Sequence, residues 1–514
     1  MARSYLTCIL LSLCVTIAGA QTAKLKLSIA HTDMDRFSYY ISDAPFTTER
    51  FFKKYTVNPA NTNRTAYLTF KSDHPQQVFI YFSPDEDTPG FNYHFYISPG
   101  DDLIFNVDLN KPDNGILVTG KGSNNNQPLL LKLTDVDVQP FYKDTLPNRV
   151  IAAINKQKPV NEKITATYID RYKPSATFAK NLRYNLAYGD IDTYFSFKEN
   201  NKFGIRPAYK RNLKAWQKVQ DSMLTAVKVR LNQKQDHLLN NDDALASSAY
   251  RSLIRNFLLR EKEHLWELSN EQPEQFYKEW YDTDKLSGEK LLQDDMQNLL
   301  KEKIINKYFT GQVAEYMYAI LISEALHESN PQNLVVIFDR FKAKYPASKY
   351  LAVYNADIAA VVKKEQQIIN GHMIFAPGNG LEINTFKEVL ALTKGKTVLV
   401  DMWGTWCGPC REEITKNSAA VKAHFKDKGL DYLYVANYDT KNEKSWKKLI
   451  AYFNLEGTHI LANEKLNKDI MATVKGSGYP TYFIIKKDGS FELSKAGYPM
   501  DRDKLIAQLE DALK

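Results

Sequence analysis

Two cysteines near the C-terminal end of the sequence are the residues most suited to chemistry. Cys407 and Cys410 are separated only by Gly408 and Pro409, and Trp406 precedes them. A thiol attacks a disulfide only as its thiolate, so disulfide exchange needs a cysteine whose pKa is lowered. The two-residue spacing puts the second thiol within reach of the first. The pair therefore indicates thiol–disulfide exchange, in which a mixed disulfide is resolved within the same chain.

The flanking sequence predicts a position that favours the thiolate. Residues 397–402 form a continuous apolar strand, as expected in a sheet that is covered on both faces, and a helix is predicted directly after Cys407. The N-terminus of a helix has unpaired N–H groups that favour an anion. Gly408 and Pro409 permit the tight first turn, since proline is tolerated where its missing N–H needs no partner.

A structural disulfide or half of a zinc site is the alternative interpretation of the cysteine pair. Zinc would need two further Cys or His ligands nearby, and neither His424 nor His459 stands at ligand spacing. We therefore expect no metal and no cofactor besides the redox-active Cys407–Cys410 disulfide or dithiol.

Residues 1–20 have the pattern of a secretory signal peptide. Arg3 begins a positive region, residues 5–17 are apolar, and Ala18-Gly19-Ala20 forms a small-residue cleavage site. A lipoprotein site at Cys14 is disfavoured by Leu13, where a small residue is needed. Removal of this segment would also remove Cys8 and Cys14. No later run reaches the ~20 apolar residues of a membrane span, so we expect a chain without a transmembrane segment, secreted across the inner membrane into the periplasm or cell envelope.

Composition and length favour a soluble protein of several domains. The 514 residues suffice for about three domains of ~150 residues each. The net charge of +8 is mild for this length. No basic block alternates with aromatic residues as a nucleic-acid groove would require, so nucleic acid is not an expected partner.

The residue patterns predict three regions after the signal peptide. Residues 21–125 are rich in β-branched and aromatic runs between turns and predict a β-rich, sandwich-like domain. Residues 126–370 have apolar residues at helical spacing and predict an α-helical domain, whose aromatic residues, among them Trp266 and Trp280, we interpret as core. Residues 371–514 alternate between strands and helices and predict an α/β domain.

The run Val-Leu-Val-Asp-Met-Trp-Gly-Thr-Trp-Cys-Gly-Pro-Cys-Arg over residues 398–411 resembles the thioredoxin superfamily, and within it the secreted TlpA/ResA-like branch. The resemblance is strong over residues 371–514, for which it implies a thioredoxin-like redox domain. It is weak over the rest, although multi-domain TlpA-like proteins of Bacteroidetes often have a β-rich and a helical region ahead of the redox domain. Pro480 matches the family's cis-proline. The interval from Cys407 to Pro480 leaves room for the extra strand–helix element of this branch, here around residues 438–466.

The resemblance implies roles for individual residues. Cys407 would be the attacking nucleophile and Cys410 the resolving thiol. Asp401 matches the buried acid that exchanges a proton with the second cysteine, and burial of a carboxyl should raise its pKa. The alternative is that Asp401 faces a wetter edge and only bonds to backbone. The substrate-binding surface would comprise Trp406, Gly408, Pro409, Tyr479 and Pro480.

Two positions depart from the family pattern. Thr415 stands where many relatives have a proline that bends the active-site helix, so we expect a straighter helix here. Tyr479 is bulkier than the usual residue before the cis-proline and should narrow access for the partner. Neither change removes a chemical group from the site.

The expected function is a thiol–disulfide oxidoreductase that reduces or exchanges disulfides of envelope proteins, with a membrane electron donor as a further partner. The sequence leaves the direction of electron flow open between reductase, oxidase and isomerase. An alternative is a client-binding or assembly module with a secondary dithiol, because the long region 21–370 exceeds what the chemistry requires. A thiol peroxidase is disfavoured, because Cys407 lacks the proline- and threonine-led context of a peroxidatic cysteine.

Overall fold

The computed structural model describes residues 21–42, 50–57, 63–72, 74–111, 115–231, 239–295 and 297–514. The chain divides into two compact units, Met1–Asn256 and Phe257–Lys514. The predicted signal peptide, residues 1–20, lies outside the described residues. In the described ranges, no helix is both long enough and apolar enough to cross a membrane.

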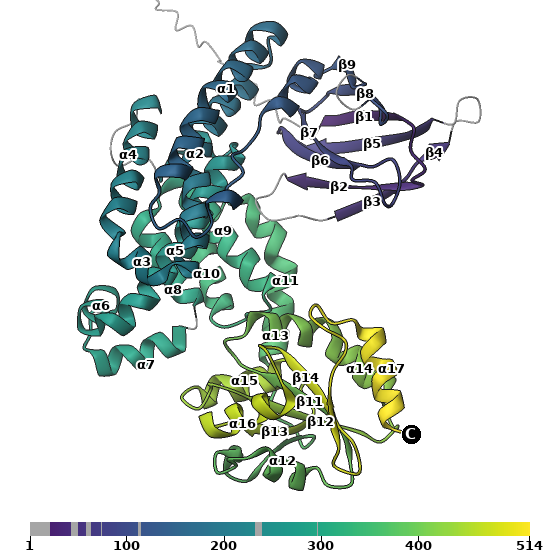
Figure 1. The fold of residues 1–514 in the computed structure, drawn as a ribbon, viewed down its shortest axis with the longest axis vertical. Helices are drawn as coiled ribbons and strands as arrows, with labels where there is room; N and C mark the ends of the chain where they lie inside the picture. The colour runs from purple at the N-terminus through teal and green to yellow at the C-terminus, as the bar shows by residue number, and fades with distance from the viewer. Residues whose placement is uncertain are drawn as a thin grey trace, which may run out of the picture. The chain divides into compact units, whose positions relative to one another are not determined.

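The first unit begins with two sheets that pack face to face (Figure 1). The described strands form one sheet in the order β4-β5-β1-β8-β9 and another in the order β3-β2-β6-β7. Inward-facing residues alternate along the strands, as with the buried Ala23, Leu25, Leu27 and Ile29 of β1, and they form one apolar core between the sheets. The bounds are β1 Gln21–Ala30, β2 Arg36–Ser42, β3 Arg50–Lys54, β4 Thr56–Val57, β5 Arg64–Ser72, β6 Gln76–Phe82, β7 Phe91–Ile97, β8 Asp102–Asp108 and β9 Leu117–Lys121.

Asn126 connects the sandwich to the helices that follow. Its buried side chain accepts a hydrogen bond from the Tyr96 N–H at 2.7 Å and donates to the Tyr96 and Gly122 carbonyls, both at 2.9 Å. Tyr96 also belongs to a buried cluster with Tyr168 and Phe178. The helices of this part are α1 Asn148–Tyr172, α2 Ala176–Gly204, α3 Arg206–Arg211, α4 Leu213–Leu231 and α5 Ser248–Glu271, of which α5 continues into the second unit.

The second unit starts with further helices and ends with an α/β domain. The helices are α6 Pro273–Tyr281, α7 Lys285–Asp295, α8 Asn298–Tyr308, α9 Gly311–His327, α10 Leu334–Lys344 and α11 Lys349–Glu365. Trp280 is buried in this region as expected, whereas Trp266 is 60% exposed, so its interpretation as a core residue is wrong. The α11 end contacts the α/β domain, where Glu365 pairs with Lys448 at 2.7 Å.

The α/β domain is built on a mixed sheet in the order β10-β13-β12-β11-β14-β15. Strand β11 is parallel to β12 and antiparallel to β14. The elements are β10 Met373–Phe375, α12 Phe386–Leu392, β11 Thr397–Trp403, α13 Gly408–Glu413, α14 Ala419–His424, β12 Leu430–Ala436, α15 Glu443–Tyr452, β13 Gly457–Leu461, α16 Glu464–Val474, β14 Thr481–Ile485, β15 Phe491–Leu493 and α17 Arg502–Ala512.

The central strand β11 is buried over its whole length because helices cover both sides of the sheet. Val398, Val400 and Met402 pack into a cluster with residues of α12 and α16. Leu399 points to the other side and packs with residues of α14 and α17, two helices that lie side by side in Figure 1. Asp401 has the same parity as Leu399, so the strand directs its carboxyl toward the helix that begins after Cys407.

These observations confirm the predicted fold class: a β-rich sandwich, a helical region and a C-terminal α/β thioredoxin-like fold. The domain boundaries at residues 125 and 370 stay a prediction.

We expect Asn126→Ala to lower the free energy of unfolding of the first unit by about 2 to 4 kcal/mol, because it leaves the buried Tyr96 N–H and C=O without partners. Calorimetric or urea unfolding would measure the change. Asn124→Ala is the matched control, because the exposed Asn124 side chain donates only to the Lys173 carbonyl, and it should cost under about 1 kcal/mol. Equal losses in the two variants would contradict this account.

Candidate redox-active site

Cys407 and Cys410 form a disulfide at the start of α13, with their Cα atoms 5.3 Å apart. Cys407 is the N-cap of the helix, and the Cys410 N–H donates to its Sγ at 3.2 Å. Cys407 is 3% exposed and Cys410 is fully buried. Gly408, half-buried, and Pro409, exposed, form the first turn of α13. A backbone donor aimed at the first sulfur favours its thiolate over the thiol.

The turn before Cys407 is held by two buried charged residues, Asp439 and Arg411, that the sequence reasoning missed. The Asp439 carboxylate accepts bonds from the Thr405 N–H at 2.8 Å and the Thr405 hydroxyl at 2.6 Å. Arg411 donates to the Thr405 carbonyl and, at 3.3 Å, to the Glu328 carbonyl at the end of α9. Burial raises the pKa of Asp439 to about 6 and lowers that of Arg411 to about 10. The network fixes the backbone that presents Cys407.

Three aromatic side chains gather beside the disulfide. The Trp406 ring meets that of Tyr479 edge-on at 5.7 Å and lies 6.1 Å from that of Tyr438. Trp406 is 38% exposed, and its indole N–H donates to the Asn437 carbonyl at 3.0 Å. Aromatic groups with one face exposed are common in binding surfaces. Tyr438 was not anticipated from the sequence.

Pairing between β11 and β14 brings the distant Pro480 to the cysteines. Met402 pairs with Thr481, the residue that follows Pro480, and Asp401 pairs with Tyr482. The Tyr479–Pro480 peptide bond is cis, as the family resemblance implies. Tyr479 and Pro480 are half-buried, and the Tyr479 hydroxyl donates to Asn467 at 2.8 Å. The structure thus assembles all the residues predicted for the substrate-binding surface around one turn.

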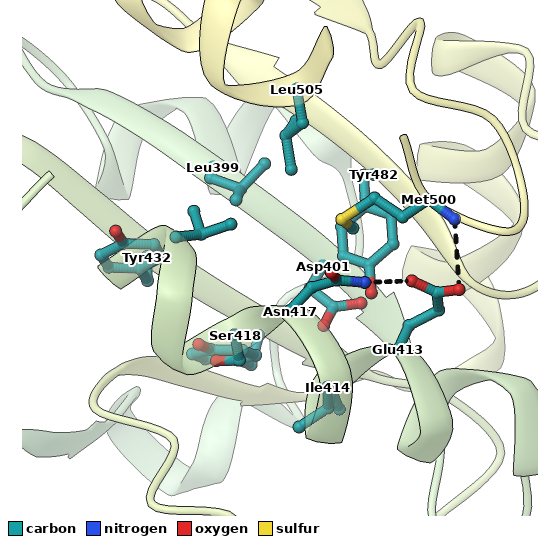
Figure 2. A pocket seen from close by; sticks show the side chains of 12 residues that line it. Leu399, Asp401, Glu413, Ile414, Asn417, Ser418, Tyr432, Tyr482, Met500 and Leu505 are labelled. Carbon is teal, nitrogen blue, oxygen red and sulfur yellow. Dashed lines mark hydrogen bonds between the residues drawn. The ribbon is translucent and has the colours of Figure 1, made fainter. Parts of the chain in front are cut away.

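Asp401 lines a small pocket together with Glu413 and Asn417 (Figure 2). It is 5% exposed, and its Oδ1 has no hydrogen-bond partner among the described residues. It borders a cavity of about 30 Å³ that Glu413 and Tyr482 also line, which is room for one or two water molecules. Burial, followed by the nearby Glu413 carboxylate, raises the pKa of Asp401 to about 8. Asp401 is therefore buried, and it does not face a wetter edge of the sheet.

Glu413 is a second carboxylate in this interior and was not singled out from the sequence. It accepts bonds from the Asn417 side chain at 2.6 Å and the Met500 N–H at 3.2 Å, both drawn in Figure 2. The negative charge of Glu413 disfavours ionisation of Asp401. The sequence did contain a signal for Glu413. It stands three residues after Cys410, which puts it one helical turn further along the same face of the helix.

The active-site helix is irregular beside Thr415, while the expectation that it is straighter than in the relatives stays a prediction. Residues Ile414–Ser418 form a π-helical turn between α13 and α14. Such turns insert one residue into the helical ladder and are frequent at functional sites. Irregularity at this point therefore occurs without the proline found in many relatives.

No group of three or more His, Cys, Asp or Glu residues suited to a metal occurs in the part of the chain that is described. His459 is fully buried among aromatic rings, and its Nε2 bonds to the Leu455 carbonyl at 2.7 Å. Burial lowers the pKa of His459 to about 4. It is a core residue in this fold.

Comparison with known proteins agrees with the geometry of the site. The Redoxin family model matches residues 384–513. The thioredoxin-like protein YneN of Bacillus subtilis is 32% identical over 131 residues, which are 25% of this chain and 71% of YneN. The chain belongs to the thioredoxin superfamily, in its TlpA/ResA-like branch. The thiol-disulfide oxidoreductase ResA of B. subtilis is 30% identical over 118 residues, which are 22% of this chain and 61% of ResA.

Each match covers only part of this chain and only part of the relative. The chain spans 52% of the Bacillus cereus ResA, at 32% identity over 96 residues. A thioredoxin domain of a Bacteroides vulgatus thiol-disulfide oxidoreductase is 26% identical, with 24% of this chain and 84% of that chain covered and a TM-score of 0.21. A TM-score this low supports no structural argument, so family membership rests on the sequence matches.

We expect Asp401→Asn to remove a pH-dependent loss of stability. The folded protein holds the Asp401 proton up to about pH 8, whereas the ordinary aspartate pKa is 3.8. Between these values the folded state binds more protons than the unfolded state, so its stability falls as pH rises. The variant should match the parent at pH 4 and exceed it by on the order of a few kcal/mol at pH 8.

Urea unfolding of the oxidised protein across this pH range would measure the effect. Asp427→Asn is the control, because Asp427 is exposed and has a positive φ that asparagine also tolerates. A stability gap for Asp401→Asn that does not grow with pH would show that Asp401 ionises normally in the folded protein.

Proposed function

We propose that this protein is an extracytoplasmic thiol–disulfide oxidoreductase that reduces or exchanges disulfides of envelope proteins through Cys407 and Cys410. The observation on which the proposal rests is the Cys407–Cys410 disulfide at a helix N-terminus, with the Cys410 N–H on the Cys407 Sγ. The names of the ResA relatives support the same chemistry.

The reaction begins with the reduced pair. The Cys407 thiolate attacks one sulfur of a client disulfide, forms a mixed disulfide and releases the other client sulfur as a thiolate. Cys410 then loses its proton and attacks the Cys407 Sγ, which releases the second client thiolate. Two electrons pass to the client, and the Cys407–Cys410 disulfide is restored.

Asp401 is proposed as the group that takes the Cys410 proton. A carboxyl whose pKa is raised to about 8 exchanges protons readily near neutrality. Glu413 would act as a positioning residue, because its charge contributes to the raised pKa of Asp401.

The surface around the cysteines is proposed to bind an extended client segment. Trp406 would pack against the client beside the mixed disulfide. Gly408 and Pro409 would leave room for the client chain to approach the first turn of α13. Tyr479 would offer backbone hydrogen bonds, and Pro480 would hold the client chain alongside.

The cellular setting is part of the proposal. The signal-peptide pattern of residues 1–20 supports secretion into the periplasm or cell envelope. A reductase in an oxidising compartment needs a source of electrons, so a membrane dithiol donor is the proposed partner that reduces Cys407–Cys410 after each turn.

The first experiment is the reduction potential of the Cys407–Cys410 pair in the mature protein, measured by equilibration with dithiothreitol. A reductase predicts a value near or below about −250 mV, whereas a value near −120 mV would indicate an oxidant. Insulin reduction should be abolished in Cys407→Ser. Cys410→Ser should accumulate a mixed disulfide that is visible on a non-reducing gel. A pair that never cycles would leave the binding-module alternative as the better account.

We expect Trp406→Ala to raise the KM for a protein disulfide about tenfold or more, because interface tryptophans often contribute over ~1.4 kcal/mol. The reduction potential should change little, because the indole has no hydrogen bond to either sulfur. Trp266→Ala is the control, since Trp266 is also exposed but lies on α5. Equal KM values for the two variants would show that Trp406 does not contribute to client binding.

A further inference from the structure

A second, larger cavity lies entirely within the first unit, remote in sequence from the cysteines. It has a volume of about 700 Å³ and lies between the outer face of β6 and β7 and the helices α1, α2 and α5. This volume is within the range of about 300–1,000 Å³ that is typical of ligand sites. The exchange reaction proposed above uses none of the residues that line it.

The cavity contains buried polar atoms without partners. Asn181 on α2 is 2% exposed and Thr165 on α1 is 3% exposed, and both line the cavity. The Asn181 Oδ1 and the Thr165 Oγ1 have no hydrogen-bond partner among the described residues. Such atoms cost free energy when they are left unsatisfied, so they are suited to hydrogen bonds with an occupant.

The charge of the lining selects against anions. Asp135, Asp190 and Asp192 line the cavity, whereas no lysine or arginine is among its described lining residues. Lys158 lies 3.9 Å from Asp190 and offsets part of this charge from outside the lining. A neutral or basic occupant therefore fits better than an acidic one.

The strand β7 gives the cavity an open sheet edge. In the order β3-β2-β6-β7 it has β6 on one side only. Both backbone groups of Tyr96 bond to Asn126 rather than to β6. Backbone groups two residues apart on a strand point the same way, so those of His94 and Asn92 also point away from β6.

Asn126 thus acts as a short substitute for a neighbouring strand at Tyr96 and leaves the rest of the edge open. Within the described residues, nothing bonds the edge-facing backbone groups of His94 and Asn92. Both residues line the cavity. Alternating N–H and C=O groups at this edge match an added β-strand better than they match a sugar.

We propose that this cavity binds an extended, neutral to basic polypeptide segment, which adds to the edge of β7 at Asn92 and His94. Its backbone would continue the sheet beyond β7, and one of its N–H groups would reach the Asn181 Oδ1. Basic side chains would lie toward the three aspartates, and Phe79 on the sheet face would receive an apolar side chain.

The test uses the full-length oxidised protein and peptides without cysteine, so that binding is independent of the dithiol. The probe is a fluorescein-labelled peptide of alternating lysine and valine, with alternating glutamate and valine as its charge-reversed match. Fluorescence anisotropy gives the affinity of each. We expect the lysine peptide to bind at least about tenfold more tightly than the glutamate peptide.

One matched pair of variants and one single variant localise the site. His94→Pro removes the edge-facing N–H, whereas His94→Ala keeps it and loses the same ring, so proline alone should weaken binding about tenfold. Asn181→Leu should weaken binding about fivefold or more. It should not destabilise the free protein, because the carbonyl it replaces has no partner there. Thermal unfolding of each variant separates lost binding from lost folding.

Several outcomes would overturn the proposal. These are absence of binding by the lysine peptide, equal affinities for the two peptides, and equal binding by His94→Pro and His94→Ala. Tighter binding of a malto-oligosaccharide that displaces the peptide would assign the cavity to carbohydrate instead. The charge comparison needs no variant and decides the question even if His94→Pro fails to fold.

Discussion

The site depends on one constraint, which is that β11 must be buried on both faces while it delivers a reactive turn at its end. Helices cover both sides of the strand, so its alternating residues divide between two apolar clusters. Asp401 is the one ionisable residue of this strand, and burial, followed by the nearby Glu413 carboxylate, raises its pKa. The same strand ends at Trp403, directly before the turn that leads to Cys407. The strand therefore contributes both to the core of the domain and to the placement of the site.

Charges around the turn are arranged in two separate groups. Asp401 and Glu413 line one small cavity that has no cationic side chain among its lining residues, and the Glu413 carboxylate disfavours ionisation of Asp401. Beside the turn, Arg411 and Asp439 compensate one another and bind the Thr405 backbone. Asp401 and Glu413 keep a proton available near the site, whereas Arg411 and Asp439 hold the backbone of the turn in place. Removing one member of the second pair would leave a buried charge unpaired, which is more costly than the pair itself.

Sequence reasoning succeeded where the signal is local. The CxxC spacing, the apolar run of β11 and the change from period 2 to helical period are each readable within a short window, and they predict the fold class and most of the site. Asp439 and Arg411 could not be identified this way, because their roles arise from contacts over long sequence separations, such as that of Arg411 with Glu328. Trp266 was misjudged because composition does not tell which face of α5 is buried. The π-helical turn at residues 414–418 has no signal in Thr415 alone.

The bond from Arg411 to Glu328 also bears on why a helical region precedes a redox domain. Glu328 follows α9, and its carbonyl is one of those left unpaired at a helix end. An arginine there donates a hydrogen bond to the carbonyl, and its positive charge interacts favourably with the negative end of the helix dipole. Because the same guanidinium also binds the Thr405 carbonyl, the backbone before Cys407 is supported by a helix outside the α/β domain. The end of α9 is therefore a structural part of the site, and a displacement of α9 would be transmitted to the turn that presents the nucleophile.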